Sequence, residues 1–222
     1  MEFTEVLKTR RSIRAFKSDP VPLNLIKQVM EESLWAPSWA NTQPWEFVVA
    51  GGQKLQEIIK QFLAKNQERP YSDIGRPPEF PEVYLNRIKA AVAPAGAARS
   101  KDDMQKHMVS SLSHYGAPAV IYILIDKSFF YTSRGTNFWS LYDCGAVAQN
   151  ICLAAANHGL GTVQQAQAVI YPDILRNVLG TAESKLFAIG IDIGYPDWNS
   201  PATKGPRTVR EPLDNLAKFV GF

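Results

Sequence analysis

The chain has 222 residues, of which 45% are hydrophobic and 20% are charged. This length suits a single domain, because it can bury a sizeable core without disulfides or metals. The formal net charge of +3 is too small to indicate nucleic-acid binding by itself.

The sequence carries no targeting or membrane signal. Met1 leads into polar residues, and no apolar stretch reaches the roughly 18 to 20 residues that a membrane span needs. Cys144 and Cys152 do not make a disulfide framework, and the three histidines lack metal-ligand spacing. We therefore expect a cytoplasmic protein with no metal site, no membrane contact and both cysteines in the core.

Hydrophobic periodicity and proline positions predict the elements of the first half of the chain. A short helix over residues 3–10 precedes a proline break, and an amphipathic helix over 25–34 stops before Pro37. A strand over 45–49 and a helix over 54–65 follow. Residues 67–104 are rich in proline and aromatic residues and predict a lid-like excursion, with a helix around 84–92.

In the second half of the chain, the hydrophobic pattern predicts two apolar strands between helices. The strands cover 119–126 and 186–193, and the helices cover 106–114, 136–158 and 173–179. Prolines from residue 196 onward predict an extended arm over about 196–222. Helices mixed with separated strands, without regular βαβ alternation, indicate one α+β domain over 1–222.

Two basic clusters are candidate anion sites. Arg10, Arg11, Ser12 and Arg14 place three guanidinium groups and a hydroxyl within five residues, and arginine matches phosphate oxygens in a bidentate manner. Lys204, Arg207 and Arg210 form the second cluster, in the arm. Taken alone, each cluster is better explained as a solvated basic surface.

Two other segments suit a flat polar ligand. The loop from Ala36 to Trp45 carries Asn and Gln amides, which donate and accept together and suit a ring edge such as an isoalloxazine; a plain turn is the alternative. Gly159 and Gly161 follow a helix instead of a strand, and Gln164 stands where a dinucleotide fingerprint needs a third glycine. We expect these glycines to cap the helix and to let the backbone approach a flat ligand.

Taken together and in this order, the four segments resemble the FMN-dependent nitroreductase family. The resemblance runs from about Thr9 to Phe219 and depends on RRSIRAF at 10–16, APSWANTQPW at 36–45, QNICLAAANHGLGT at 149–162 and REPL at 210–213. The aromatic excursion is similar to that of the nitrobenzoate reductase subgroup. The resemblance implies a sandwich with a central, mainly antiparallel sheet flanked by helices, in an intertwined homodimer with two FMN sites at its interface.

The resemblance also implies roles for individual residues. Arg10, Ser12 and Arg210 would hold the phosphate, Arg11 the phosphate or ribityl chain, and Arg14 the pyrimidine end, where a positive charge raises the reduction potential. Relatives carry a basic residue where this chain has Thr208, so Arg207 is the candidate substitute. The remaining cofactor-binding candidates are Pro37, Ser38, Trp39, Asn41 and Gln43 from the other subunit, and the main chain around Gln164, Gln165 and Ala166 near the ring.

The implied reaction is a two-stage transfer in which NAD(P)H delivers hydride to the flavin and a small aromatic acceptor then takes its place. A nitroaromatic would go to the nitroso compound and then to the hydroxylamine, with no protein side chain as nucleophile or dedicated base. The candidate substrate-face residues are aromatic: Tyr71, Phe80, Tyr84, Phe130, Tyr131, Phe138 and Trp139.

Two alternatives remain open at this point. The first is reductive dehalogenation of a halotyrosine-like substrate, although the loop here reads TQPW and no lid trio for an amino-acid zwitterion is evident. The second is a non-enzymatic anion- or nucleic-acid-binding module, which the small net charge disfavours. The sequence does not identify the physiological acceptor or the preference between NADH and NADPH.

Overall fold

The computed structural model describes residues 1–75, 77, 79–92, 101–205 and 207–222. Residues 76, 78 and 93–100 of the predicted excursion, and residue 206 of the predicted arm, lie outside the described residues. In the described part of the chain, no helix is long and apolar enough to cross a membrane.

A four-stranded antiparallel sheet forms the centre of the fold. Its strands are β1 (Trp45–Gly51), β2 (Ala119–Asp126), β6 (Lys185–Gly194) and β5 (Gly161–Gln165), in that spatial order. The two inner strands, β2 and β6, are buried over most of their length, which is why both read as continuous apolar runs in the sequence. The predicted α+β architecture with a mainly antiparallel sheet is confirmed.

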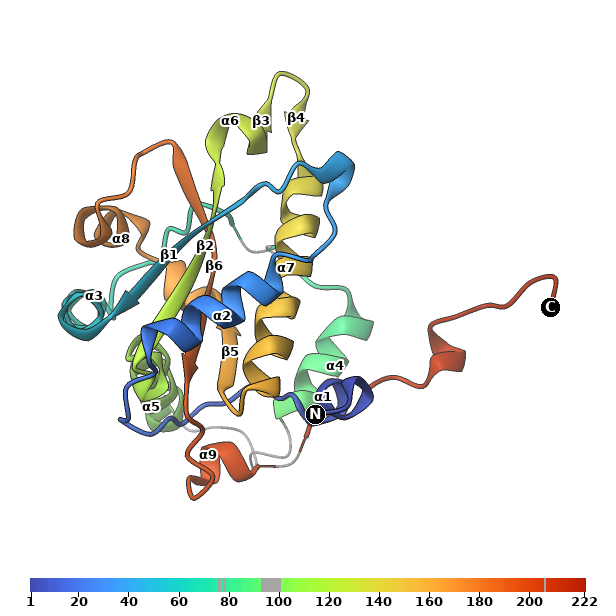
Figure 1. Ribbon diagram of the computed structural model, residues 1–222, viewed down its shortest axis with the longest axis horizontal. Helices are drawn as coiled ribbons and strands as arrows, with labels where there is room; N and C mark the ends of the chain where they lie inside the picture. Colours follow the sequence, from blue (N-terminus) through green and yellow to red (C-terminus); the bar gives the residue numbers. More distant parts are fainter. Residues whose placement is uncertain (76, 78, 93–100, 206) are drawn as a thin grey trace.

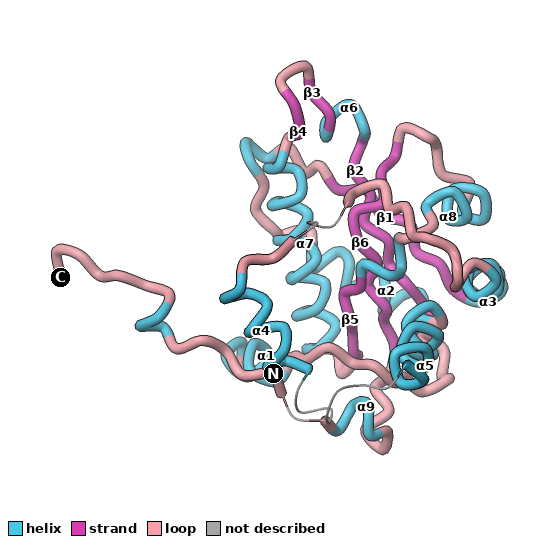
Figure 2. The backbone as a smooth tube through the Cα atoms, turned by 180° about the vertical axis from the view of Figure 1, so that it is seen from behind, coloured by secondary structure: helices cyan, strands magenta, loops and turns pink. Residues whose placement is uncertain are grey.

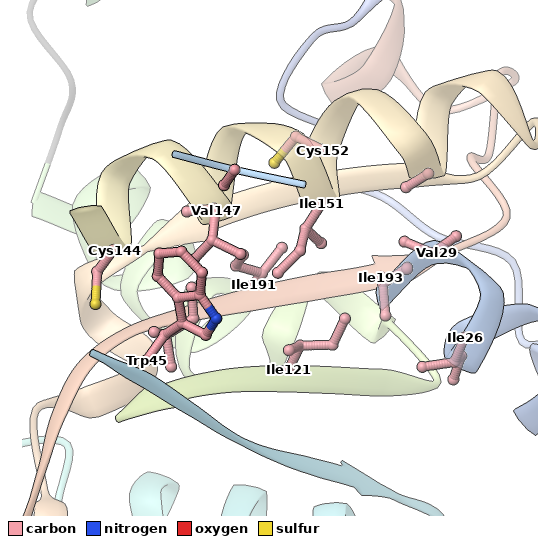
Figure 3. Packing of buried hydrophobic residues seen from close by; sticks show 14 of the residues in the cluster. Ile26, Val29, Trp45, Ile121, Cys144, Val147, Ile151, Cys152, Ile191 and Ile193 are labelled. Atoms are coloured by element: carbon pink, nitrogen blue, oxygen red, sulfur yellow. The ribbon is translucent and has the colours of Figure 1, made fainter. Parts of the chain in front are cut away.

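Helices cover both faces of the sheet, as Figure 1 shows. On one face lie α2 (Leu23–Ser33) and the long α7 (Phe138–Asn157); on the other lie α3 (Gly52–Ala64), α5 (Lys101–Leu112) and α8 (Pro172–Leu179). Each face has its own hydrophobic cluster. In Figure 3, Trp45, Val147 and Ile191 pack between α7 and the sheet, beside both cysteines. Cys144 and Cys152 are therefore buried free thiols, as expected.

The remaining elements lie at the periphery. They are α1 (Phe3–Thr9), α4 (Glu82–Val92), α6 (Lys127–Phe130), α9 (Pro201–Lys204), the small hairpin of β3 (Tyr131–Thr132) and β4 (Gly135–Thr136), and 3-10 turns at 39–41, 114–116, 166–169 and 213–215. The end of the chain leaves the body as an extended arm (Figures 1 and 2). A helix within the excursion and an extended arm were both predicted.

The sequence did not predict β5. Its five residues, Gly-Thr-Val-Gln-Gln, carry too little apolar signal and follow a helix end closely. Gly159, with φ of +75°, ends α7 in the left-handed conformation, as expected for a helix-terminating glycine. Gly161 serves a purpose that was not predicted: a Cβ there would lie 2.6 Å from Ile13 Cγ1 and 2.9 Å from Pro196 Cγ. Gly161 was expected to let a flat ligand approach the main chain, but the groups that approach it are Ile13 and Pro196 of the same chain.

We predict that Gly161→Ala lowers the free energy of unfolding by about 1 to 3 kcal/mol, because the new methyl group overlaps Ile13 and Pro196. Chemical denaturation of the protein measures this value. The control is Gly205→Ala, whose Cβ would meet only Pro201 O at 3.8 Å and which should change stability by less than about 0.5 kcal/mol. Equal stability of the two variants would contradict the proposed close packing at Gly161.

Candidate functional site

A strongly basic cavity of about 510 Å³ lies where the N-terminal segment meets the arm. Both basic clusters of the sequence line it, and they contribute Arg10, Arg11 and Arg14 from one side and Arg207 and Arg210 from the other. Lys8, Ser12, Leu7 and Thr208 complete the lining. No Asp or Glu of the described residues lines this cavity, so an anion would meet six positive side chains without an opposing carboxylate. We call these lining residues the clamp.

Hydrogen bonds between the two basic segments close the clamp. Arg207 Nη2 donates to the main-chain oxygen of Arg10 at 2.5 Å, and Arg11 Nη2 donates to Gly205 O. Arg210 Nη1 donates to Thr208 Oγ1 at 2.7 Å, so Thr208 orients a guanidinium group although it carries no charge. The segments are about 195 residues apart in the sequence, yet they bind each other directly.

The arm is also joined to α4, the helix of the predicted excursion. Arg87 Nε lies 3.1 Å from Glu211 Oε1, and the Asn215 amide and then Arg87 lower the pKa of Glu211 below its usual value. Arg87, Ala90 and Ala91 face residues 207–212 across a second cavity. The glutamate of the REPL motif therefore connects the excursion to the clamp.

Strand β5 joins the clamp to the sheet. Ile13 N–H donates to Thr162 C=O at 2.9 Å, and Ser12 bridges to Thr162 in a parallel manner. Along an antiparallel strand, successive residues point their main-chain groups to alternate sides. Because Thr162 uses the side away from β6, the main-chain N–H and C=O of Gln164 point to that same side. No described strand pairs with β5 there, so these groups are available to a ligand.

The polar loop between α2 and β1 has a strained backbone. Ala40, Asn41 and Gln43 all have positive φ, at 47°, 61° and 44°, which is unusual for residues other than glycine. Local hydrogen bonds hold this shape: Gln43 N–H donates to Ser38 Oγ at 3.0 Å, and Gln43 Nε2 donates to Asn41 Oδ1 at 3.1 Å. Backbone strain of this kind is concentrated at functional sites, where the surrounding structure maintains it.

Asp143 fixes this loop to α7. Its carboxylate is 2% exposed and accepts the Trp39 N–H at 3.1 Å. Trp39 and Trp139 line a shared cavity of about 280 Å³ together with Thr42, Phe129, Asn137 and Asp143. The structure therefore brings together Trp39, a predicted cofactor-binding residue, and Trp139, a predicted substrate-face residue.

Within one chain, the loop and the clamp lie at opposite ends of α7. Asp143 holds the loop near the first turns of the helix, whereas Ala156 lines a cavity with Arg10 and Arg11 near its end. At 1.5 Å per residue, the 13 helical steps from Asp143 to Ala156 correspond to about 20 Å. Figure 1 shows α1 at the end of α7 that is opposite to β3 and β4. The two groups of candidate residues do not form one site within a single chain.

The structure separates most of the predicted substrate-face residues. Phe130 is a core residue, 4% exposed, so it does not line an open surface. Tyr71 lies between α3 and α8, where Lys65 Nζ donates to its hydroxyl at 2.9 Å and where it bonds Asp173. The other predicted residues are exposed on α4, its preceding segment, β3 and the start of α7: Phe80, Tyr84, Tyr131, Phe138 and Trp139.

Sequence reasoning missed Lys8, Thr208, Thr162 and Asp143. Lys8 and Thr208 flank the basic motifs and could have been included on that ground. The roles of Thr162 and Asp143 depend on contacts with residues that are more than 100 positions away, and no local pattern indicates such contacts. Within the described residues, no group of three or more metal-ligating side chains is found.

Comparisons with known proteins agree on one family. The model of the nitroreductase family matches residues 7–195. Nitroreductase NfnB of Mycolicibacterium smegmatis is 31% identical over 224 residues, which cover 96% of this chain and 91% of that protein. A 4-nitrobenzoate reductase of a Nocardioides species is 26% identical and covers 98% of this chain and 90% of its own length.

Solved structures give the same result. The crystal structure of NfnB from Mycobacterium smegmatis, described as FMN-dependent and in complex with NADPH, has a TM-score of 0.86 and 30% identity, covering 98% of this chain and 97% of that one.

We predict that Asp143→Ala releases the strained loop, because the partly buried N–H of Trp39 loses its acceptor at a cost of about 1 kcal/mol. Limited chymotrypsin digestion should then cut after Trp39 faster than in the wild-type protein. Asp143→Asn keeps an accepting oxygen and should stay resistant. If both variants are cut at the wild-type rate, Asp143 does not hold the loop.

Proposed function

The chain belongs to the nitroreductase family, and from this premise we propose that it is an FMN-dependent oxidoreductase that uses NAD(P)H to reduce nitroaromatic or similar small aromatic acceptors. The observation that carries the proposal is the clamp, which offers six basic side chains and a serine hydroxyl and has no acidic side chain among its described lining residues. Such a donor set fits a phosphate monoester dianion, because guanidinium groups bind its oxygens with charge-assisted hydrogen bonds. In this proposal Arg10, Ser12, Arg14 and Arg210 hold the cofactor, with Arg11 and Arg207 maintaining the shape of the clamp.

The ring end of the cofactor is assigned to the outward side of β5. The main chain of Gln164 offers rigid hydrogen-bonding groups that need no reorganisation when a ligand binds. The hydrogen bond between Ile13 and Thr162 fixes the distance between these groups and the clamp. The bound flavin supplies the redox chemistry, and the residues of the chain bind it, orient it and adjust its potential.

The proposal includes a homodimer in which each cofactor contacts both chains. Residues 37–43 of one chain then meet the clamp of its partner, which removes the separation of about 20 Å along α7. The monomer leaves large apolar side chains in water, among them Trp35 at 89%, Phe138 at 72% and Tyr142 at 71% exposure. Such exposure is typical of a surface that a partner covers.

The reaction balances as one nitroaromatic, one NAD(P)H and one proton giving the nitroso compound, NAD(P)⁺ and water, and a second NAD(P)H and proton give the hydroxylamine. The chain's contribution is to bind both reactants in turn over one face of the cofactor. The exposed aromatics at the start of α7 and the cavity shared by Trp39 and Trp139 are candidates to contact the acceptor. Cytoplasmic location remains part of this proposal.

We predict that Arg10→Ala combined with Arg210→Ala weakens FMN binding by about 2 to 4 kcal/mol, or about 30- to 1000-fold in Kd, because two charge-assisted contacts with the phosphate are lost. Quenching of flavin fluorescence during titration measures Kd. The control is Lys54→Ala with Lys60→Ala, which removes the same charge from the exposed side of α3. Unchanged affinity in the clamp variant would overturn the assignment.

An acceptor panel tests the substrate class. We expect NADPH or NADH to bleach the yellow protein, and 4-nitrobenzoate or nitrobenzene to restore the colour faster than a halotyrosine does. Faster reoxidation by the halotyrosine, with halide release, would favour the dehalogenase alternative. A colourless protein that does not bind added FMN would favour a non-enzymatic anion- or nucleic-acid-binding module.

A further inference from the structure

A polar network lies in the core behind the end of β5. Gln165 is 5% exposed, and its side chain points into the core on the side of α5. Its Oε1 accepts from Ser111 Oγ at 2.9 Å, and its Nε2 donates to Asp192 Oδ2 at 2.6 Å and to Ser111 O at 3.3 Å. The amide is thereby held by bonds to both its oxygen and its nitrogen, so its orientation is fixed.

Asp192 is the centre of this network. It is fully buried on β6, opposite Val163 of β5, and its Oδ1 lies 2.7 Å from His114 Nδ1. Within the described residues, no lysine or arginine pairs with it. Burial, and then the Asp192 carboxylate, raise the pKa of the neighbouring Tyr122 well above its usual value.

Several features of this network lower the free energy of unfolding. Among the residues that the structure describes, His114 Nε2 and Tyr122 Oη are buried and find no hydrogen-bond partner. His114, Tyr115 and Gly116 have φ of 51°, 53° and 79°, so three successive residues adopt the left-handed conformation where His114 enters the core. A well-packed apolar core at this place would avoid both the unsatisfied groups and the strain. Because the network lowers stability in this way, we infer that it has a functional role in addition to packing the core.

The network contacts the proposed site through one residue. Gln165 lies in β5 directly after Gln164, whose main chain points outward beside the clamp, and directly before the 3-10 turn Ala166–Val169. Its side chain lies on the face of the sheet that α5 covers, where hydrogen bonds to Asp192 and Ser111 hold it. Any rotation of the strand end would break these buried hydrogen bonds.

We propose that Gln165, held by Asp192 and Ser111, is a positioning residue that fixes the main chain of residues 164–166 against the flavin ring. The inference rests on the proposed function, because it requires FMN to bind along β5. A main chain held in this way provides preorganised hydrogen-bond donors and acceptors. Oxidised and reduced FMN differ in charge and in protonation, so such a main chain binds the two forms with different affinities.

Matched donor and acceptor exchanges test the proposal. Asp192→Asn places an amide donor against the Gln165 amide, and Gln165→Glu places a second carboxylate against Asp192. The double variant D192N/Q165E restores one donor and one acceptor at this contact. For each holoprotein, the readout is the ratio of the Kd values for oxidised and reduced FMN, measured anaerobically, together with the free energy of unfolding.

We expect each single variant to change this ratio by about tenfold, the equivalent of one hydrogen bond, and the double variant to recover most of the change. The matched control is Asp73→Asn, because Asp73 also accepts two hydrogen bonds, from Arg176 and from Phe187 N–H, but does not contact β5. It should lower stability and leave the ratio unchanged.

Lower stability of the Gln165 and Asp192 variants with an unchanged ratio would overturn the proposal and leave a purely structural network. A double variant that differs from wild type as much as the single variants would also overturn it. If either single variant does not fold, Ser111→Ala removes one bond to Gln165 and gives the same readout. Failure of the wild-type protein to bind FMN would refute the proposed function instead.

Discussion

The main-chain hydrogen bond from Ile13 N–H to Thr162 C=O joins the basic N-terminal segment to the open edge of the central sheet. Gly161 makes this approach possible, because any side chain there would meet Ile13 and Pro196. Once the contact is made, the arginines before Ile13 and the outward main chain after Thr162 have a fixed spatial relation. The arm then completes the clamp through the bonds of Arg207 and Arg11. The contacts of Ser12 and Ile13 with Thr162 thus connect the basic pocket to the outward main chain of β5.

The polar loop between α2 and β1 is also held in one conformation by specific hydrogen bonds, and it lies at the other end of α7 from the clamp. Its three residues with positive φ are held by Ser38, by Asn41 and by the buried Asp143. A strained loop and a basic clamp that are about 20 Å apart along one helix cannot share a small ligand within one chain. In the proposed homodimer, the loop of one chain would meet the clamp of its partner, and the partner would also cover aromatic side chains that one chain exposes.

The sequence predicted much of the fold and part of the site. β2, β6 and α7 were found within a few residues because their apolar runs are long, and the two arginine clusters were found because charge is visible in composition. β5 was missed because Gly-Thr-Val-Gln-Gln has little periodicity, and the Gly161 contact was misassigned because its partner is Ile13. Phe130 looked like a substrate contact but lies in the core. Asp143, His114 and Asp192 bind residues remote in the sequence, and local patterns carry no information on such pairs. The resemblance to the nitroreductase family is confirmed by the family match over residues 7–195.

The central claim is that one flavin site needs the clamp of one chain and the loop of another. Subunit complementation tests it most directly. One variant lacks the clamp (Arg10→Ala with Arg210→Ala), and the other lacks the loop contacts (Ser38→Ala with Asn41→Ala). The two variants are co-expressed with different affinity tags, and the doubly tagged species is purified. If each site is shared between two chains, each homodimer binds FMN poorly, whereas the mixed dimer binds one FMN per two chains with wild-type affinity. A mixed dimer that binds no better than either parent would contradict the account.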